Sequence, residues 1–301
     1  MRPTVNLCLY NHSRRSVLDQ VWFAEEVFAQ HGYELICTQT LRPDCINLLI
    51  EHFVEEDVGT LQAFCQRFGK QIGIVMTEHI ELGAAGFSFN GAPLRDSQYI
   101  DNKEQRLFSL LSLADQVFAF FTFGEMPELQ SWGDVLPCQS LYRLPYPSIR
   151  KINHRATRRE HDVVFTGAPT PYRESVLKQV SRRHRLVQGN SESTEAERAD
   201  LYASAKVALN IPQAKGWQWV SPMRVLYGLR VGTPTVHLGR HDATLFTKLV
   251  LEPIELDQAV QEHEAVFQRQ LGSYEDFVHS HYNHRFPDGV FDVWGELEQL
   301  R

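Results

Sequence analysis

Two histidines in polar loops offer the clearest acid–base chemistry in this sequence. His12 follows the apolar run 5–10 and is preceded by Asn11, while His79 stands beside Glu78 just after another apolar run. An imidazole titrates near neutral pH and a neighbouring carboxylate can orient it, so either position could take a proton from a hydroxyl group. A helix-capping histidine and a polar turn are the structural alternatives. We expect only one of the two positions to hold a general base.

A glycine and an arginine in the second half of the chain have the chemistry to bind a phosphate group. Gly167 follows the apolar run 162–166, where the missing side chain lets a ligand approach the backbone. Arg173 comes shortly afterwards, and a guanidinium can bind two phosphate oxygens at once. The alternatives are an ordinary turn for the glycine, and an ion pair with Glu174 or Glu160 for the arginine.

Residues 221–232 are typical of a short helix that faces an anion. Ser221 suits the N-cap and Pro222 the first helical position, while Gly232 suits a left-handed C-terminal cap. The first turn of such a helix offers free N–H groups and the positive end of its dipole. Arg224 adds a cation to the same turn.

The loop before this helix adds further candidates. Asn210 ends the predicted strand 206–210, and Lys215 follows it at a position from which it could contact a phosphate. Trp217 or Trp219 could stack on a nucleobase or a sugar ring.

Short apolar runs alternate with amphipathic stretches along most of the chain, which predicts strands and helices in βαβ order and a parallel, doubly wound sheet. A Gly-rich stretch at 83–98 interrupts the order and predicts a long loop. The predicted strands are 5–10, 34–40, 45–53, 71–77, 116–121, 162–166, 185–188, 206–210 and 235–238. The predicted helices are 16–31, 57–68, 104–113, 172–184, 196–204 and 221–232.

Length and composition are those of an ordinary globular protein. The 301 residues, 43% of them hydrophobic, suit two domains, 1–150 and 151–301, with the C-terminal helix expected to pack back on the first. The net charge of −7 argues against binding of nucleic acid or an anionic membrane through the overall charge of the protein. Five cysteines without a C-x-x-C pair suggest free thiols. Residues 1–4 lead directly into a strand and no apolar run could span a bilayer, so we expect a cytoplasmic protein without a signal peptide.

Several classes of site are excluded by their missing motifs. No G-x-x-x-x-G-K-[ST], no G-x-G-x-x-G after the first strand and no G-x-S-x-G occurs, which argues against a P-loop enzyme, a typical dinucleotide fold and a serine hydrolase. His279, His281 and His284 have no cysteine or carboxylate set to complete a zinc site, so we expect no metal.

Three segments, in order, resemble the GT-B glycosyltransferases, and within these the CgeB-type (spore-maturation) branch. Residues 224–236 are similar to the family's R-φ-φ-E-A-L-A-x-G-x-P-V-V segment. Residues 161–177 resemble the strand, glycine, arginine and helix that open its donor domain, and residues 281–285 resemble its H-T-Y-x-x-R element. The resemblance covers roughly residues 160–290 and implies two Rossmann-like domains that face a cleft.

The resemblance implies a glycosyltransferase that moves a sugar from a nucleotide-sugar donor to an acceptor hydroxyl. The second domain would hold the donor, and the first domain the acceptor, with His12 or the pair Glu78 and His79 as base. The nucleotide sugar is a substrate, and no cofactor is expected. The acceptor (a glycan, a protein, a small molecule or a modified base) and the oligomeric state stay open. The predicted donor-binding residues are Gly167, Arg173, Asn210, Lys215, Trp217, Ser221, Met223, Arg224 and Tyr227.

The sequence departs from the family at one important point. Retaining members often carry two glutamates eight positions apart, and these positions are occupied here by Trp219 and Tyr227. Their absence favours an inverting reaction, which we expect to be metal-independent. It also leaves open a non-catalytic protein that binds a nucleotide sugar or a partner, and, less strongly, an epimerase or a phosphorylase of this fold.

Overall fold

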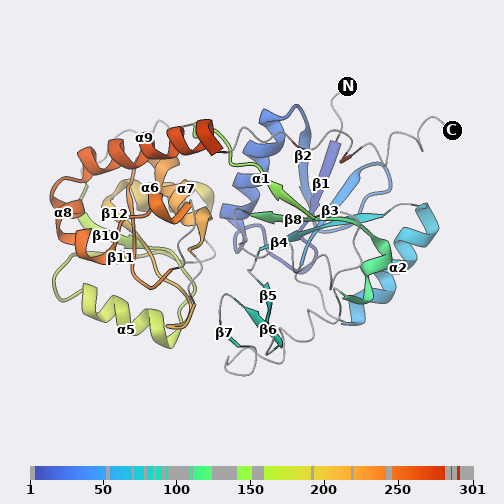
Figure 1. The fold of residues 1–301 in the computed structure, drawn as a ribbon, viewed down its shortest axis with the longest axis horizontal. Coiled ribbons are helices and arrows are strands. Elements are labelled where there is room, and N and C mark those ends of the chain that lie inside the picture. Colours follow the sequence, from blue (N-terminus) through green and yellow to red (C-terminus); the bar gives the residue numbers. More distant parts are fainter. Residues whose placement is uncertain are drawn as a thin grey trace. The chain divides into compact units, whose positions relative to one another are not determined.

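The computed structural model divides into two compact units (Figure 1). Unit 1 contains residues 1–14, 20–147 and 283–301, and unit 2 contains residues 15–19 and 148–282. The structure describes residues 4–51, 55–69, 71–77, 80–83, 86–89, 92–93, 109, 111–123, 141–150, 159–190, 193–217, 220–241, 246–281, 286 and 290–291.

Unit 1 is built on a parallel sheet of six strands in the order β2-β1-β3-β4-β8-β9. The strands β3, β4 and β8 are buried along their whole length, as expected for a parallel sheet that is covered on both faces. The chain runs from β1 to β2 in one direction and from β3 to β4 in the other, so the sheet is doubly wound. The strands are Thr4–Cys8 (β1), Glu34–Thr38 (β2), Ile46–Ile50 (β3), Ile72–Met76 (β4), Val117–Phe123 (β8) and Leu141–Leu144 (β9).

Two helices of unit 1 follow the predicted spacing. Helix α1 (Leu18–Gln30) connects β1 to β2, and helix α2 (Glu55–Phe68) connects β3 to β4. Three acidic residues lie in the first turn of α2, where their negative charges interact favourably with the positive end of the helix dipole. Its buried residues are spaced by three and four positions, so one stripe of the helix packs inward: Val58, Leu61 and Cys65.

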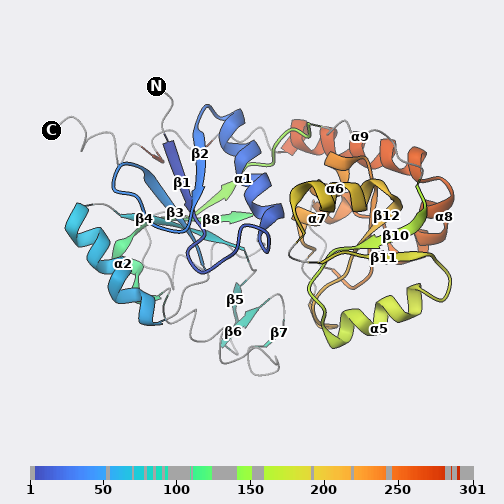
Figure 2. The same ribbon diagram turned by 180° about the vertical axis from the view of Figure 1, so that it is seen from behind.

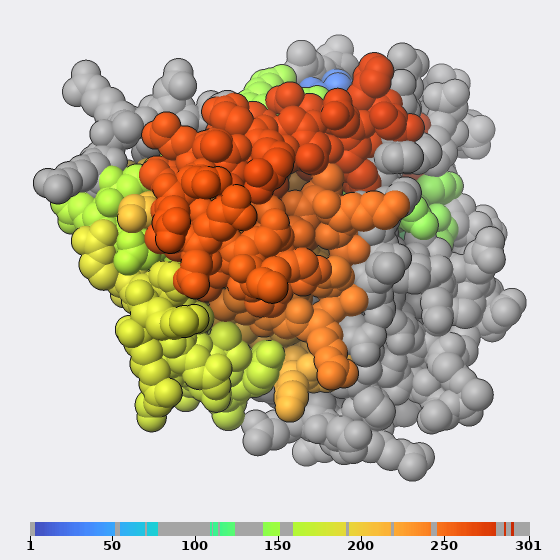
Figure 3. All heavy atoms as spheres, turned by 60° about the vertical axis from the view of Figure 1, so that its left-hand side comes forward, coloured from blue at the N-terminus to red at the C-terminus, as the bar shows by residue number. Residues whose placement is uncertain are grey.

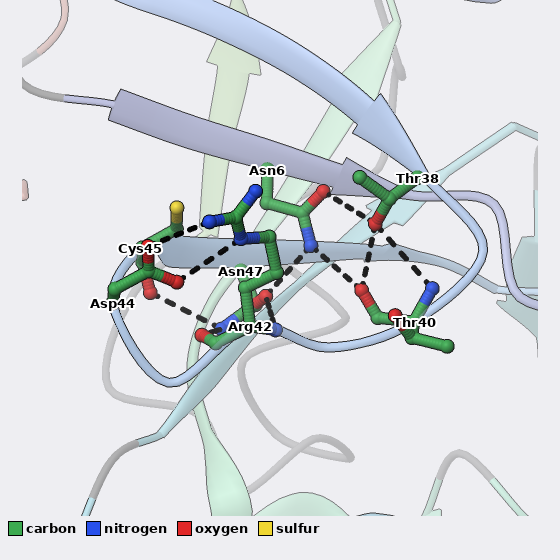
Figure 4. Close-up of polar contacts among 7 residues, drawn as sticks. All are labelled: Asn6, Thr38, Thr40, Arg42, Asp44, Cys45 and Asn47. Carbon is green, nitrogen blue, oxygen red and sulfur yellow. Dashed lines mark hydrogen bonds and ion pairs between the residues drawn. The ribbon is translucent and has the colours of Figure 1, made fainter.

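The connection from β2 to β3, residues 39–45, contains no helix, and side chains make many of its hydrogen bonds (Figure 4). Asn6 and Asn47 are fully buried, in register on β1 and β3, and 2.8 Å apart from amide nitrogen to amide oxygen. Asn6 donates to the Thr40 carbonyl at 3.0 Å, and Asn47 both donates to and accepts from the Arg42 backbone. The two amides thus satisfy loop backbone groups that the sheet leaves unpaired.

Replacing Asn47 with leucine is expected to lower the free energy of unfolding by roughly 2–5 kcal/mol, because several buried polar groups lose their partners at once. Urea denaturation measures the change. The control is Asp44→Ala, which removes the exposed ion pair with Arg42 and should change stability little. Equal destabilisation by both variants would contradict the role of the amide.

The predicted loop 83–98 is wrong in part, because this stretch contributes to a small antiparallel sheet. Strand β5 (Ile80–Gly83) pairs with β6 (Gly86–Phe89), which pairs with β7 (Ala92–Pro93). Within this Gly-rich stretch, apolar and small residues alternate, which is compatible with short hairpins. The remaining residues of the predicted loop lie outside the described ranges.

Unit 2 contains a parallel sheet of four strands in the order β11-β10-β12-β13. Helix α5 leads from β10 to β11, whereas α6 and α7 lead back towards β12 and β13. Right-handed crossovers therefore place α5 on one face and α6 and α7 on the other, as Figures 1 and 2 show. The elements are His161–Phe165 (β10), Pro171–Val180 (α5), Leu186–Gln188 (β11), Glu195–Ala203 (α6), Ala205–Asn210 (β12), Pro222–Val231 (α7), Thr235–His237 (β13), Leu256–Gln261 (α8) and His263–His281 (α9).

Helix α7 ends as the sequence predicts. Gly232 adopts φ +84°, the left-handed conformation expected of a C-terminal cap. Arg159 donates to the Gly232 carbonyl at 2.7 Å and to the Thr233 hydroxyl at 3.1 Å, so it joins the end of this helix to the preceding segment. Gly228 allows the helix to lie close to β13, because a Cβ there would be 2.6 Å from the Thr235 hydroxyl.

The last described residues belong to unit 1. Phe286 stacks on Phe28 at 5.1 Å between ring centroids, and Phe291 stacks on Phe121 at 5.9 Å. Both are buried, so the chain returns to the first unit after α9.

The predicted fold class is confirmed for the units themselves: the chain is an α/β protein with two Rossmann-like, doubly wound units. A cleft between them stays a prediction. Among the described residues, none of the helices has the length and apolar character that crossing a bilayer requires.

Candidate functional site

The strand order of unit 2 places a binding position at the carboxyl ends of β10 and β12. The chain leaves these neighbouring strands in opposite directions, and ligands of open α/β sheets bind at such a switch point. The loops 166–170 and 211–220 follow the two strands there. Both contain residues that the sequence singles out.

The side chains around Gly167 leave no room for a larger residue at this position. A Cβ at this position would lie 2.4 Å from the Phe165 ring and 3.0 Å from the Arg224 guanidinium. The ring of Phe165 is also contacted by two cations, since the guanidinium carbons of Arg173 and Arg224 lie 5.5 and 5.6 Å from its centroid. The carboxyl end of β10 is therefore a place of concentrated positive charge.

Arg173 holds the two loops together. Its side chain is buried, and its Nε donates to the Ile211 carbonyl at 3.0 Å while a terminal nitrogen donates to the Ala168 carbonyl at 2.9 Å. The N-cap residue Thr170 adds a link, because its hydroxyl donates to the Gln213 carbonyl at 2.8 Å. Arg173 thus links the two loops of the switch point, and the direct phosphate contact that the sequence predicts stays a prediction.

Asn210 connects the end of β12 to the start of α7. Its amide donates to the Ser221 carbonyl at 3.1 Å, and its oxygen accepts from Arg224 at 3.3 Å. Removal from water lowers the pKa of the half-buried Arg224, although a guanidinium stays charged at any ordinary pH. Ser221 is the N-cap of α7, as the sequence predicts, although its side chain makes no capping hydrogen bond.

A cavity of about 740 Å³ opens beside these loops. Its walls come from one face of α5 and from the loops that follow β12 and β13, all within unit 2. Figure 3 shows this face, with α5 in yellow-green and the two loops in orange. Three of the residues that line the cavity carry exposed polar side chains: Gln179, Lys215 and Arg240.

The loop after β13 packs tightly against the loop after β12. A Cβ at Gly239 would lie 2.8 Å from Pro212 and 3.0 Å from the Nε2 atom of His237. Burial lowers the pKa of His237 to about 4, so this imidazole is neutral at pH 7. His241 fixes the far end of the loop through a 2.7 Å contact with Glu252. One wall of the cavity is therefore anchored on both sides.

Three predicted donor-binding residues are packed inside unit 2. Trp217, Met223 and Tyr227 are 6%, 4% and 0% exposed. The Tyr227 ring contacts Tyr202 of α6 at 5.1 Å between centroids, and its hydroxyl donates to the Glu195 carbonyl at 3.4 Å. Because their side chains face the interior, we leave these three residues out of the donor site proposed below.

In unit 1, the switch point lies between β1 and β3, and His12 is in the loop that follows β1. The neighbouring Tyr10 has φ +50°, an uncommon conformation for a residue other than glycine. Asn11 donates to Asp57 of α2 at 2.9 Å, which fixes the loop beside the helix. Glu78 and His79 lie outside the described residues.

A buried glutamate at the same edge of unit 1 escaped the sequence analysis. Glu51 follows β3, is 6% exposed, and accepts hydrogen bonds from the Thr77 amide at 3.0 Å and the Thr77 hydroxyl at 2.7 Å. It therefore joins the carboxyl ends of β3 and β4 immediately before Glu78. A charged residue within the predicted strand 45–53 was the sequence signal that could have identified Glu51.

Comparisons with known proteins find distant likenesses among solved structures. No protein-family model and no curated protein matches this chain. An alpha1,3-fucosyltransferase aligns with 99% of this chain and 90% of its own, at 10% identity and a TM-score of 0.41. TarM aligns with 85% of this chain and 55% of its own, at 10% identity and a TM-score of 0.44. The lipopolysaccharide outer core galactosyltransferase WaaB, in its apo form, aligns over both full lengths at 10% identity and a TM-score of 0.39.

Unit 2 contains cations, a helix N-terminus and a partly apolar cavity. Unit 1 contains His12 in the loop after β1. In the described part of the chain, no three His, Cys, Asp or Glu side chains are grouped closely enough to hold a metal ion.

Proposed function

We propose that this protein is a glycosyltransferase that moves a sugar from a nucleotide-sugar donor to an acceptor hydroxyl. The observation that carries the proposal is the cavity of unit 2, which lies beside the switch-point loops and has Lys215 and Arg240 among its walls. A nucleoside diphosphate has an apolar, ring-shaped end and an anionic end. Its dimensions suit a cavity of about 740 Å³.

The diphosphate would be held by positive charge from several sources. Lys215 is exposed at the cavity, and the first turn of α7 offers backbone N–H groups. Arg224 is held at that turn by Asn210, and Arg173 fixes the loops around Gly167. The resemblance of residues 161–177 and 224–236 to a donor domain supports the same assignment.

The acceptor would bind at unit 1, with His12 as the base that removes the proton of the attacking hydroxyl. Glu78 and His79 form the alternative base. We propose inversion of configuration, because the two positions that carry glutamates in retaining relatives are aromatic here. Tyr227, which occupies one of them, is fully buried against α6.

A thermal-shift screen with UDP-, GDP-, TDP-, ADP- and CMP-linked sugars tests donor binding. Ligand at about 100 times its Kd stabilises the native state by about 2.7 kcal/mol, which is easily measured. At least one nucleotide sugar is expected to raise the Tm, and failure of all of them would contradict the proposal. Binding without any turnover would instead favour a non-catalytic nucleotide-sugar-binding protein.

Activity is expected to survive removal of divalent metal ions. Helix N-termini and cationic side chains can stabilise a diphosphate leaving group without a metal, so the rate with excess EDTA should stay within about two-fold of the untreated rate. The measurement is release of the nucleoside diphosphate with and without EDTA. A loss of activity that Mg²⁺ or Mn²⁺ restores would show that the enzyme needs a metal.

A further inference from the structure

The described walls of the cavity are rich in hydrogen-bond donors. Lys215 and Arg240 have only donors, and Gln179 offers one amide donor group and one carbonyl acceptor. None of the described residues that line the cavity carries a carboxylate. A ligand that fits this chemistry presents mainly acceptors and negative charge.

The rest of the lining suits a flat ring. Tyr172 and Val176 are half-buried on α5 and pack against the core of unit 2, which leaves part of each side chain facing the cavity. Leu238 and Pro253 add apolar surface from the other walls. An aromatic ring beside aliphatic side chains is a common platform for a nucleobase.

The bases differ in how well they match these walls. Uracil has two carbonyl acceptors that flank one N–H donor, so the Gln179 amide can accept from the N–H and donate to one carbonyl, and a cation can approach the other. Guanine has an N–H and an amino group side by side. The Gln179 carbonyl cannot accept from both, and the remaining donor faces described walls that carry cations and no carboxylate, which disfavours guanine.

We infer that the cavity binds a nucleoside diphosphate whose base is a pyrimidine dione, uracil or thymine, with Gln179 reading its edge and Tyr172 against its face. This inference rests on the proposed function and names the donor class: UDP- or TDP-linked sugars. Lys215 and Arg240 contact the diphosphate at the open side. Arg240, Gln179 and Tyr172 are specificity and binding residues that the sequence motifs do not indicate.

Gly216 offers a position at the cavity wall where a larger side chain can be added without a clash. It lines the cavity, its backbone lies outside the left-handed region, and a Cβ built there meets no atom within 4 Å. Gly216→Leu therefore places a side chain in open space. Gly272→Leu is the matched control, because Gly272 of α9 also has no atom within 4 Å of a built Cβ and does not line the cavity.

Titration calorimetry of the full chain with UDP, TDP, GDP, ADP and CDP tests the inference. UDP or TDP is expected to bind at least ten-fold more tightly than GDP, Gly216→Leu to abolish this binding, and Gly272→Leu to leave it unchanged. Tighter binding of GDP, ADP or CDP would overturn the base assignment alone. UDP binding that survives Gly216→Leu would overturn the location, and binding of no nucleotide would contradict both the inference and the proposed function.

Gln179→Glu provides an independent readout. A carboxylate at this position accepts from both donors of guanine and repels the carbonyls of uracil. The UDP dissociation constant divided by the GDP dissociation constant should therefore rise at least ten-fold. Gln179→Ala should reduce the preference without reversing it. An unchanged ratio in both variants would show that Gln179 does not contact the base.

Discussion

Arg173→Ala is expected to lower the free energy of unfolding by about 2–4 kcal/mol and to weaken donor binding as a consequence. The variant removes the donors of the Ile211 and Ala168 carbonyls, and Ile211 is fully buried, so its oxygen is left without a partner inside the unit. The two loops of the switch point then lose their connection, so the phosphate-binding backbone is no longer positioned. Calorimetric unfolding measures the first effect, and nucleotide titration measures the second.

Arg182→Ala is the control, since Arg182 is an exposed arginine shortly after the same helix. It should change neither stability nor affinity appreciably. A fully stable Arg173→Ala protein with lost affinity would show that the guanidinium contacts the ligand directly, as the sequence motif suggests. A stable protein with unchanged affinity would remove Arg173 from the account altogether.

Asp19→Ala is expected to destabilise the protein by about 3–5 kcal/mol, because it leaves a buried guanidinium without its counter-charge. Arg198 is 3% exposed and lies 2.6 Å from an Asp19 carboxylate oxygen. Its other terminal nitrogen donates to the Arg15 carbonyl at 3.2 Å, so the arginine fixes the whole segment 15–19 within unit 2. Urea denaturation provides the measurement.

A neighbouring ion pair supplies the comparison for this variant. Glu195 pairs with Arg230 at 2.8 Å but is 44% exposed, so Glu195→Ala should cost less than about 1 kcal/mol. If both variants had similarly small effects, the Asp19–Arg198 pair would not be the buried anchor that the structure indicates.

Most strands and helices of the two parallel sheets could be predicted because most apolar runs are long enough to fill one strand of a buried sheet, whereas β9, α8 and α9 were not predicted. Strand β12 and helix α7, with Pro222 at its start and Gly232 at its end, follow the local rules closely. The hairpins β5–β7 were missed because their glycines are equally typical of loops. Composition alone does not distinguish a glycine-rich loop from a glycine-rich hairpin.

The site was predicted less completely because topology, rather than local pattern, assembles it. Lys215 was identified from its position after a strand, whereas Arg240 lies outside the motifs and Tyr172, although inside the segment 161–177, was not selected; they reach the same cavity from a different loop and helix. Trp217 was selected for its aromatic chemistry and Tyr227 for its place in the segment that resembles the family, but both side chains are buried. A sequence pattern does not say which face of a short helix meets the core.

The most direct test of the proposed function is to incubate the purified protein with each nucleotide sugar and a mixture of hydroxyl acceptors, and to follow both products by mass spectrometry. We expect release of a nucleoside diphosphate together with an acceptor that has gained the mass of one sugar, and neither product with Gly216→Leu. Nucleotide sugars that bind but stay intact with every acceptor would contradict the assignment as a transferase.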